Sequence, residues 1–573
     1  KLSKIESKMV NLFQYNTNHI IHLKNMKLII IIISVLTSAV AFSQTDFDKD
    51  ISQILNSYVG AESEPGITVG VVQNGELIYH ASKGSMNLEY KLPFNDSTVF
   101  ELASITKQFT SACIGILQKQ GKLSINDDVR KYIPELANYK DTIQIKHLLN
   151  HTSGIRNHNV LLDLQGFDYK HRGYTNKMIQ ELMFKQEGVN NLPGEKMLYS
   201  NTNYVLLALI IERVSGIKIE EFAKQEIFEP LKMHNTFYSK NLEDIIENRA
   251  YPYYKESGQY LQPKSLTHCI GAGGIGSTVQ DLAKWSNVFL NPNHDFFYLT
   301  DFITELDTLN NGQLMKHARG MFISPYKGFT TYNHSGRDLG MRSQFICIPM
   351  KSLAVIVYTN SEDINAVNIS YELLNLFIDE TPSGNLIQEK YKHSNKQKKR
   401  FEGIYQELNS DLRMEIFVEN DTLKAISSFG RNATPLISKG DNSLVRIDNP
   451  SIVYTFQTEE YTDADLLVDF GGAIFYFERI EISTSSNQSL DEFVGSYYSD
   501  ELNVTYSISL ENSNLILSYP NNEGVQIKEG VKDTFGANRR TKYTFNRDNK
   551  GKVISFSVAS EGTVKDILFE KIN

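Results

Sequence analysis

A serine and a lysine stand three residues apart at Ser104 and Lys107, where the sequence pattern predicts that a helix begins. Residues at i and i+3 of a helix share a face, so the lysine amine can reach the serine hydroxyl. Serine becomes a nucleophile when a neighbouring base accepts its proton, and lysine becomes a base when burial or a nearby positive potential lowers its pKa. The first turn of a helix supplies such a potential, together with N–H groups that can bind an oxyanion. The pair therefore indicates acyl transfer through a serine intermediate.

A bare Ser-x-x-Lys match says little by itself, because Ser215 and Lys218 have the same spacing. The apolar segment 205–214 predicts a buried helix that ends at Ser215 and Gly216. At a helix C-terminus the dipole has the wrong sign for an activated serine. For Ser104 the alternative to a catalytic role is an ordinary exposed helix start. Motifs elsewhere in the chain are needed to distinguish these two interpretations.

Two further patterns follow Ser104-Ile-Thr-Lys107 along the chain. Tyr199-Ser200-Asn201 precedes the predicted buried helix, and His334-Ser335-Gly336 lies in a predicted strand. Each short pattern recurs elsewhere, for example at Tyr358-Thr-Asn360, so only the order and the context of helix start, loop and strand are specific. In that order and context, the set resembles the serine beta-lactamase and penicillin-binding-protein family, in its class C-like branch, over about residues 47–379.

The resemblance implies a role for each catalytic side chain. Ser104 is expected to attack a carbonyl carbon and become acylated, while Lys107 and Tyr199 share its proton. The phenol would be held near a cation that favours its ionised form. Which of the two groups is the formal base stays open. The oxyanion is expected between the backbone N–H groups of Ser104 and Arg337.

The remaining site residues are expected to face the substrate. Asn201 should hydrogen-bond an amide or carbonyl of the substrate, and His334, followed by Ser335 and Gly336, should line the cleft beside the phenol. Plainer roles are an interface aromatic for Tyr199, a helix cap for Asn201 and a satisfied strand residue for His334.

Other charged residues near these motifs have weaker assignments. True class C beta-lactamases resemble one another in having lysine at the position of His334, so this chain looks more like the carboxypeptidase and esterase branches. Arg337 and Arg342 could attract a substrate carboxylate, and solvated surface roles are the alternative. We assign His151 to loop structure and Asp281 to a helix N-cap.

The elements around the motifs predict an α+β fold, and the resemblance implies that it is of the beta-lactamase/transpeptidase type. Asn74-Gly75 joins two β-rich runs, which is a strong hairpin signal. An antiparallel sheet with the terminal helices on one face and a helical insertion as a second lobe would place a cleft where the lobes meet. The sheet and its helices are expected over residues 47–58, 67–79, 330–336, 342–348, 353–358 and 364–378.

Residues 401–573 change to short alternating runs, and they repeat. Gly403 matches Gly495, Asn420 matches Asn512 and Phe477 matches Phe569, so the offset is a constant 92 positions. A constant offset indicates two copies of one module, each with about eight strands that could close a small barrel. We therefore predict a leader and signal peptide over 1–44, a hydrolase domain over 45–380, a linker over 381–400 and all-β accessory modules over 401–481 and 490–573.

Composition excludes several classes of function. The net charge of −9 and the pI of about 5.9 argue against a nucleic-acid-binding surface. The 3 cysteines lack the spacing of a disulfide framework or a metal site, and no cofactor is expected. A basic start at Met26-Lys27, the apolar run from Leu28 and small residues at Ala39 and Ala41 predict a secretory signal peptide. An uncleaved membrane anchor is the alternative, and residues 1–25 look like upstream translated sequence or a long leader.

These observations predict a bacterial serine hydrolase that is exported to the periplasm or secreted and works through a Ser104 acyl-enzyme. Its partner would be a small-molecule or peptide substrate, including a cell-wall D-amino-acid peptide, an amide or an ester. A class C-like beta-lactamase and a catalytically silent penicillin-binding or sensor protein are the alternatives. A further possibility is that the repeated barrels dominate function by binding a glycan or a partner. The sequence does not fix the oligomeric state.

Overall fold

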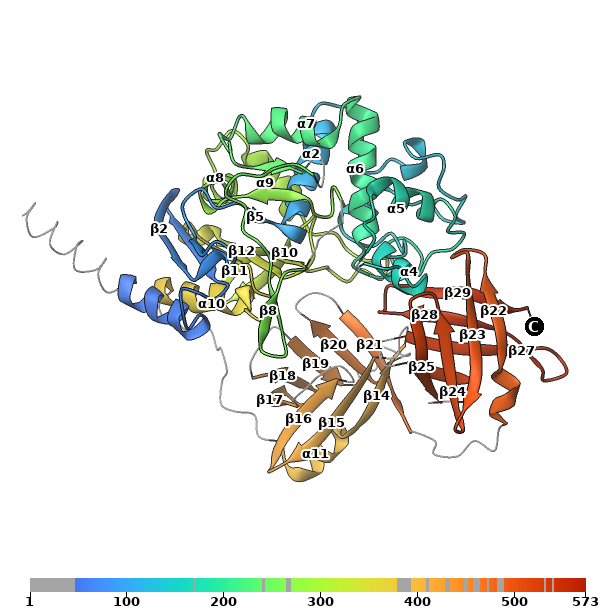
Figure 1. Ribbon diagram of the computed structural model, residues 1–573. Helices are drawn as coiled ribbons and strands as arrows, with labels where there is room; N and C mark the ends of the chain where they lie inside the picture. The colour runs from blue at the N-terminus through green and yellow to red at the C-terminus, as the bar shows by residue number, and fades with distance from the viewer. Residues whose placement is uncertain are drawn as a thin grey trace, which may run out of the picture.

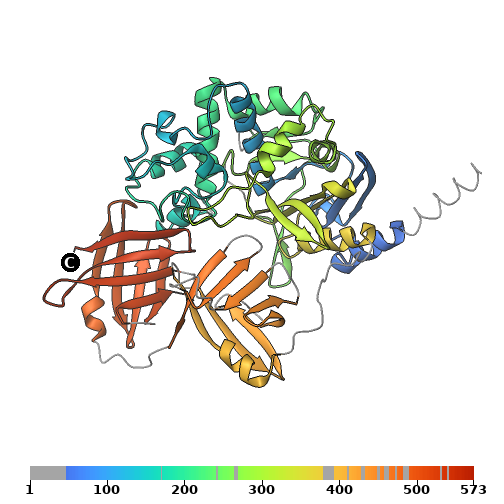
Figure 2. The ribbon, with the colours of Figure 1, turned by 180° about the vertical axis from the view of Figure 1, so that it is seen from behind.

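The computed structural model describes residues 47–572 with some internal positions excepted, so the predicted leader and signal peptide lie outside the described residues. The chain forms a first domain over residues 47–378 and two β-barrels, which lie side by side below it in Figures 1 and 2. The internal positions that are not described are 170, 240–242, 264–268, 379–392, 409–411, 428–432, 448–451, 457–463, 471–473, 482–488, 530–531 and 538–540.

A six-stranded antiparallel sheet forms the centre of the first domain. Asn74 and Gly75 make the tight turn between its last two strands with φ of 51° and 87°, as the Asn-Gly signal predicts. In spatial order the strands are β10 (Phe322–Tyr326), β11 (Phe329–Asp338), β12 (Met341–Ile348), β13 (Leu353–Thr359), β1 (Ile67–Gln73) and β2 (Glu76–Lys83). The sequence predicted all of these except β10.

Helices cover both faces of this sheet. The helix over residues 47–58 and α10 (Ala366–Phe377) pack on one face, as predicted, and share a core with Val69 and Val355. On the other face lies α8 (Val279–Leu290), whose Trp285 indole N–H donates to Gln108 Oε1 at 2.8 Å. Because Gln108 belongs to the helix that begins after Ser104, this bond ties the sheet to the second lobe.

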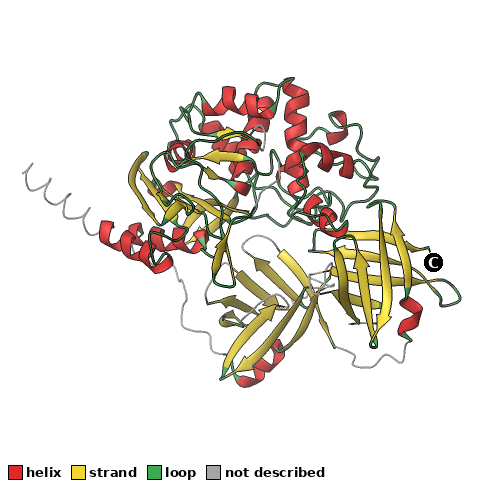
Figure 3. Cartoon of the chain, in the orientation of Figure 1, coloured by secondary structure: helices red, strands yellow, loops and turns green. Residues whose placement is uncertain are grey.

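The second lobe is the helical insertion that the sequence predicted, and Figure 3 shows its helices gathered above the barrels. Its helices are α2 (Thr106–Lys119), α3 (Ile145–Leu149), α4 (His158–Leu164), α5 (Asn176–Met183), α6 (Asn201–Ser215), α7 (Ile219–Ala223), the π-helix Lys224–Phe228 and α9 (Phe297–Thr304). Short strands complete the domain: β3 (Ser85–Asn87), β4 (Leu92–Pro93), β5 (Phe100–Glu101), β6 (Phe237–Tyr238), β7 (Tyr254–Glu256), β8 (Gln259–Leu261) and β9 (Ile275–Ser277).

The repeat forms two closed barrels of eight strands each, which confirms the predicted fold of both modules. Tyr405 donates its hydroxyl to the Phe401 carbonyl at 2.9 Å, and Tyr497, 92 positions later, donates to the Phe493 carbonyl at 2.8 Å. The first barrel contains β14 (Gly403–Glu407), β15 (Arg413–Glu419), β16 (Thr422–Ser427), β17 (Thr434–Gly440), β18 (Ser443–Arg446), β19 (Ile452–Phe456), β20 (Leu466–Phe470) and β21 (Ile474–Ile480). The second contains β22 (Gly495–Ser499), β23 (Val504–Glu511), β24 (Asn514–Tyr519), β25 (Asn522–Glu529), β26 (Thr534–Ala537), β27 (Thr541–Arg547), β28 (Val553–Ser560) and β29 (Val564–Lys571).

The stretch predicted as a linker is only partly one. Its described end forms α11 (Asn395–Phe401), which packs on β15 and buries Phe401 in the core of the first barrel. Ser394 and Gln397 cap this helix reciprocally. The sequence prediction overlooked this capping box because the residues that follow it are basic and resemble a solvated linker. No helix among the described residues is both long and apolar enough to cross a membrane.

Candidate active site

The Ser104–Lys107 turn begins on a strained residue. Ala103 has φ of 49°, a left-handed conformation that costs an L-residue about 1–2 kcal/mol. A short 3-10 turn over Ala103–Ile105 precedes α2, whereas the sequence predicted one continuous helix from Ser104. The turn is held from the sheet side, because Ser343 Oγ donates to the Leu102 carbonyl at 2.9 Å. The strained turn places Ser104 partly exposed at the junction between the lobe and the sheet.

Lys107 is buried and fully partnered. Its Nζ donates to Ser104 Oγ at 3.0 Å, to Asn201 Oδ1 at 2.9 Å and to the Ala272 carbonyl at 2.9 Å. Burial lowers the pKa of the Lys107 amine to about 7. In its neutral form the amine can keep both N–H groups on Asn201 and Ala272 and turn its lone pair toward the Ser104 hydroxyl. The geometry therefore suits proton transfer from serine to lysine.

Tyr199 lies on the other side of the nucleophile. Its hydroxyl hydrogen-bonds Ser104, and Lys107 Nζ lies 5.0 Å from its ring centroid. The amine that was expected to supply a cation is thus nearby, but the expected stabilisation of the ionised phenol is wrong. Burial raises the pKa of the Tyr199 hydroxyl, and the bond from Ser104 offsets only part of that rise. The phenol is therefore neutral and placed to donate a proton.

Two buried histidines hold Tyr199 in position. The His151 ring stacks on Tyr199 at 4.2 Å between centroids, and His151 Nδ1 accepts the Ser200 backbone N–H at 3.2 Å. His317 packs against His151, with the ring centroids 4.9 Å apart. His151 thus has the structural role that the sequence assigned to it. His317 was missed, because no motif surrounds it and only the fold brings it to Tyr199.

Asn201 is already engaged on both ends of its amide. While Oδ1 accepts from Lys107, Nδ2 donates to Asn159 Oδ1 at 2.8 Å, and the backbone N–H donates to Asn157 Oδ1 at 3.3 Å. Asn201 begins α6 directly after the N-cap position at Ser200, so it does not cap the helix itself. In this geometry the Asn201 side chain mainly holds Lys107. A substrate amide that bonded Asn201 would have to share its amide group with Lys107 and Asn159.

Strand β11 brings the third motif to the nucleophile. There is no room for a side chain at Gly336, where a Cβ would lie 2.3 Å from the Leu102 carbonyl oxygen, so the strand approaches the Ser104 turn closely. His334 is buried 6.2 Å from Tyr199 between ring centroids, and its Nδ1 contacts the Ser335 carbonyl at 2.6 Å. Burial, with a smaller contribution from Lys107, lowers the pKa of His334 to about 3. A neutral imidazole therefore lies beside the phenol.

The far half of β11 has a free edge. Pairing between β10 and β11 ends at Phe322 and Asn333, so no described strand pairs with residues 334–338 on that side. This open edge runs past Ser104, and it contains the backbone of Arg337, the expected second oxyanion donor. The Arg337 side chain points to solvent, and both it and Arg342 contact the Glu362 carboxylate, at 3.4 Å and 2.9 Å. A substrate carboxylate would have to compete with Glu362 for these arginines.

Two expectations outside the catalytic set have definite outcomes. Thr278, rather than Asp281, caps α8 by accepting the Asp281 backbone N–H, and Asp281 is instead a buried acceptor for Asn235 and Thr236. The three cysteines are free thiols, as expected from their spacing. Among the described residues no group of histidine, cysteine and acidic side chains is arranged to hold a metal ion.

Comparisons with known proteins agree with this geometry. The beta-lactamase family profile matches residues 51–374, more than half of the chain. Penicillin-binding protein 4* of Bacillus subtilis is 31% identical over 340 residues, covering 54% of this chain and 71% of that protein. Protein flp of Staphylococcus aureus is 26% identical over 324 residues, which are 55% of this chain and 63% of that protein.

Solved structures share the fold. The octameric penicillin-binding protein homologue from Pyrococcus abyssi aligns with a TM-score of 0.51 at 23% identity, over 84% of this chain and 98% of that one. The D-amino acid amidase from Ochrobactrum anthropi aligns with a TM-score of 0.50 at 21% identity, over 58% of this chain and 99% of that one. The first likeness extends beyond residues 47–378 and so includes part of the barrel region. With the profile match and the Bacillus relative, we conclude that the chain belongs to the beta-lactamase family of serine hydrolases.

Proposed function

We propose that this protein is an exported serine hydrolase that cleaves peptide, amide or ester bonds through an acyl-enzyme on Ser104. The observation that carries the proposal is the buried Lys107 amine, which lies 3.0 Å from Ser104 Oγ and has a pKa lowered to about 7. A lysine with an ordinary pKa would stay protonated and could not activate the serine at neutral pH.

Acylation would begin when neutral Lys107 accepts the Ser104 proton as Oγ attacks the carbonyl carbon. The oxyanion that forms would be held by the backbone N–H groups of Ser104 and Arg337, and each such donor contributes about 3–4 kcal/mol to transition-state stabilisation. As the intermediate collapses, neutral Tyr199 would donate its proton to the leaving nitrogen or oxygen. The Lys107 ammonium would then return a proton to the phenol. Water would release the acyl group by the reverse sequence.

The open edge of β11 supports a peptide as the substrate class. An extended peptide can pair with an unpartnered strand edge through its backbone, and this edge passes beside the nucleophile. The relationship to a penicillin-binding protein is consistent with D-amino-acid peptides of the cell wall. A class C-like beta-lactamase activity is the second candidate, and His334 in place of lysine argues against it.

The test is to label the purified protein with a fluorophosphonate probe and to measure turnover of p-nitrophenyl esters, D-amino-acid peptides and a beta-lactam. Wild type should be labelled at Ser104, and Ser104→Ala should lose labelling and turnover by about 10⁴-fold or more. Equal labelling of the two proteins would reject the acyl-enzyme. Binding of the beta-lactam without turnover of any substrate would favour the sensor alternative.

Export rests on the N-terminal sequence alone, outside the described residues. Expression of the full gene in a bacterium should give a periplasmic or secreted protein whose N-terminus lies near Gln44. A cytoplasmic, uncleaved product would contradict the signal peptide.

A further inference from the structure

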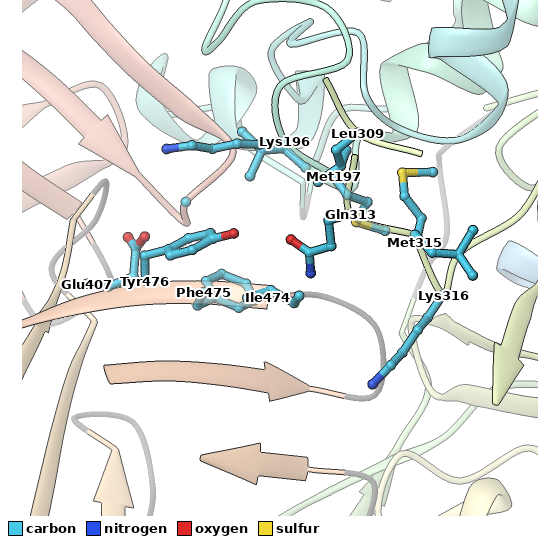
Figure 4. A pocket seen from close by; sticks show the side chains of 13 residues that line it. Lys196, Met197, Leu309, Gln313, Met315, Lys316, Glu407, Ile474, Phe475 and Tyr476 are labelled. Carbon is cyan, nitrogen blue, oxygen red and sulfur yellow. The ribbon is translucent and has the colours of Figure 1, made fainter. Parts of the chain in front are cut away.

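A small cavity lies where the first domain and both barrels meet (Figure 4). The first domain contributes residues 196–198 and 313–316, the first barrel contributes Glu407 and residues 474–476, and the second barrel contributes Gly562. The geometry of this cavity, together with the function proposed above, leads us to propose that it binds one apolar, uncharged residue of the peptide substrate.

Three segments of the cavity wall continue along the chain into residues that form or support the active site. Leu198 precedes the catalytic Tyr199, and Lys316 precedes His317, which packs against His151 beneath that tyrosine. Gly562 precedes Thr563, whose carbonyl accepts the backbone N–H of Asn157 at 3.2 Å. Asn157 in turn holds Asn201, so each wall segment is one residue from a group that forms or supports the site.

Most of the lining is apolar or aromatic, and two features of it lack a partner. Leu314 is 59% exposed at the mouth, where an uncovered leucine gains from contact with a ligand. Gln313 Oε1 is buried without a hydrogen-bond donor, and Figure 4 shows its amide projecting toward the side chains of β21. A bound side chain can cover Leu314 and so remove its apolar surface from water.

The charges around the cavity favour an uncharged ligand. Lys196 lies 5.5 Å from the Tyr476 ring, and Glu407 lines the same cavity with the opposite sign. Lys316 forms an ion pair with Asp469 of β20, which neutralises it. With the signs balanced, a terminal charge on the peptide gains no net attraction, so an internal residue fits better than a chain end.

The size of the cavity limits its occupant to a single residue. About 60 Å³ is open to the centres of water-sized molecules, enough for a few waters or one side chain. Phe475 lies at the wall close to Gly562, where an added Cβ would be 3.2 Å from its ring. The first barrel therefore contributes to substrate selection through β21, although it holds none of the catalytic groups.

The experiment compares kcat/KM for a D-alanine p-nitroanilide with that for the same substrate extended at its N-terminus by an acetylated leucine, phenylalanine, glutamate or lysine. Wild type should prefer the leucine and phenylalanine extensions, and Phe475→Ala should reduce the ratio of extended to short substrate by about tenfold. Leu314→Ser, at an exposed position that folding tolerates, should reduce the same ratio by a smaller factor. Phe417→Ala, at a half-buried phenylalanine of β15 outside the cavity, is the matched control and should keep the wild-type ratio.

The outcomes separate this inference from the proposed function. If wild type shows no preference for apolar extensions, or if both cavity variants keep the wild-type ratio, the cavity is not a substrate subsite. If Ser104→Ala cleaves short and extended substrates as wild type does, the acyl-enzyme itself is wrong.

Discussion

The two barrels are copies of one module, yet they are attached to the first domain in different ways. The same tyrosine bond occurs in both, and Asn420 and Asn512 have the same φ of 48° at equivalent turns. The core of the second barrel is continuous with that of the helical lobe, whereas the core of the first barrel is a separate cluster. The shared barrel fold therefore does not determine how each module is attached, and the outward-facing residues decide it.

The second barrel holds the segment that supports Lys107. Arg156 is buried between the lobe and the barrel, where it forms an ion pair with Glu501 and donates to the Lys565 carbonyl at 3.0 Å. The next residue, Asn157, links the Thr563 carbonyl to Asn201, and Asn201 contacts Lys107. The second barrel is thus four hydrogen bonds from Ser104.

The first barrel contacts the first domain mainly through side chains around the cavity. Lys316 pairs with Asp469, and Lys196 lies over the ring of Tyr476. Neither of these contacts involves Ser104, Lys107 or Tyr199, so the first barrel is expected to affect which substrate is chosen rather than whether the site forms.

Deleting each barrel in turn should give the largest difference between the two barrels in the labelling of Ser104. Truncation after residue 481 exposes the core that the second barrel shares with the lobe, so the protein should lose fluorophosphonate labelling at Ser104 and aggregate. Replacing residues 393–488 by a flexible linker removes a self-contained core and should keep labelling of Ser104. Labelling that survives the truncation, or is lost with the linker, would reverse our assignment of the two barrels.

Breaking the ion pair at the second barrel should cost more stability than breaking the ion pair at the first barrel. Arg156→Leu leaves the Glu501 carboxylate without its partner at a buried interface, and breaking such a pair typically costs about 3–5 kcal/mol. Lys316→Met removes an ion pair whose lysine is about half exposed, which is worth about 0–1 kcal/mol. Urea unfolding followed by tryptophan fluorescence measures both, because Trp285 lies in the core of the first domain. Similar losses in the two variants would show that the interfaces are equivalent.

The pH dependence of kcat/KM should shift when Asn201, which the second barrel supports, is changed. It should not shift when a charge in the first barrel is changed. If neutral Lys107 is the base, kcat/KM should fall as pH drops through about 7. Asn201→Asp places a carboxylate beside the amine, which favours the ammonium and should move the midpoint upward by about 1–3 pH units. Asp469→Asn, which changes charge in the first barrel, is the control and should keep the wild-type midpoint. A midpoint that stays near 7 in Asn201→Asp would mean that another group controls the rate.

The sequence predicted most of the features that depend on local patterns of residues. The Asn74-Gly75 turn, the helices beside the sheet and the repeat at an offset of 92 all depend on residues close in the chain or on self-similarity. The three motifs were identified as a set, and the structure brings Ser104, Lys107, Tyr199 and His334 together. Their roles in catalysis remain predictions that the labelling experiment tests.

What the sequence did not predict depends on long-range packing. Burial decides that the phenol of Tyr199 stays protonated, and no local signal reports how deeply a tyrosine will lie. His317 and Asn157 reach the site only through the folded lobe and the second barrel. The helix at 395–401 was missed because its basic composition resembles a solvated linker, although Ser394 and Gln397 form a capping box.

The smallest and best-matched test uses the tyrosine that both barrels share. Tyr405→Phe and Tyr497→Phe each remove one buried hydroxyl that donates to a phenylalanine carbonyl, at 2.9 Å and 2.8 Å, and each should cost about 1–2 kcal/mol within its own barrel. Because only the second barrel shares its core with the lobe, Tyr497→Phe should lower the temperature at which Ser104 labelling is lost. Tyr405→Phe should lower the unfolding temperature of the first barrel in calorimetry and leave the labelling temperature as in wild type. Equal shifts in labelling temperature would mean that the first barrel also stabilises the active site, and the distinction between the two copies would then rest on the cavity alone.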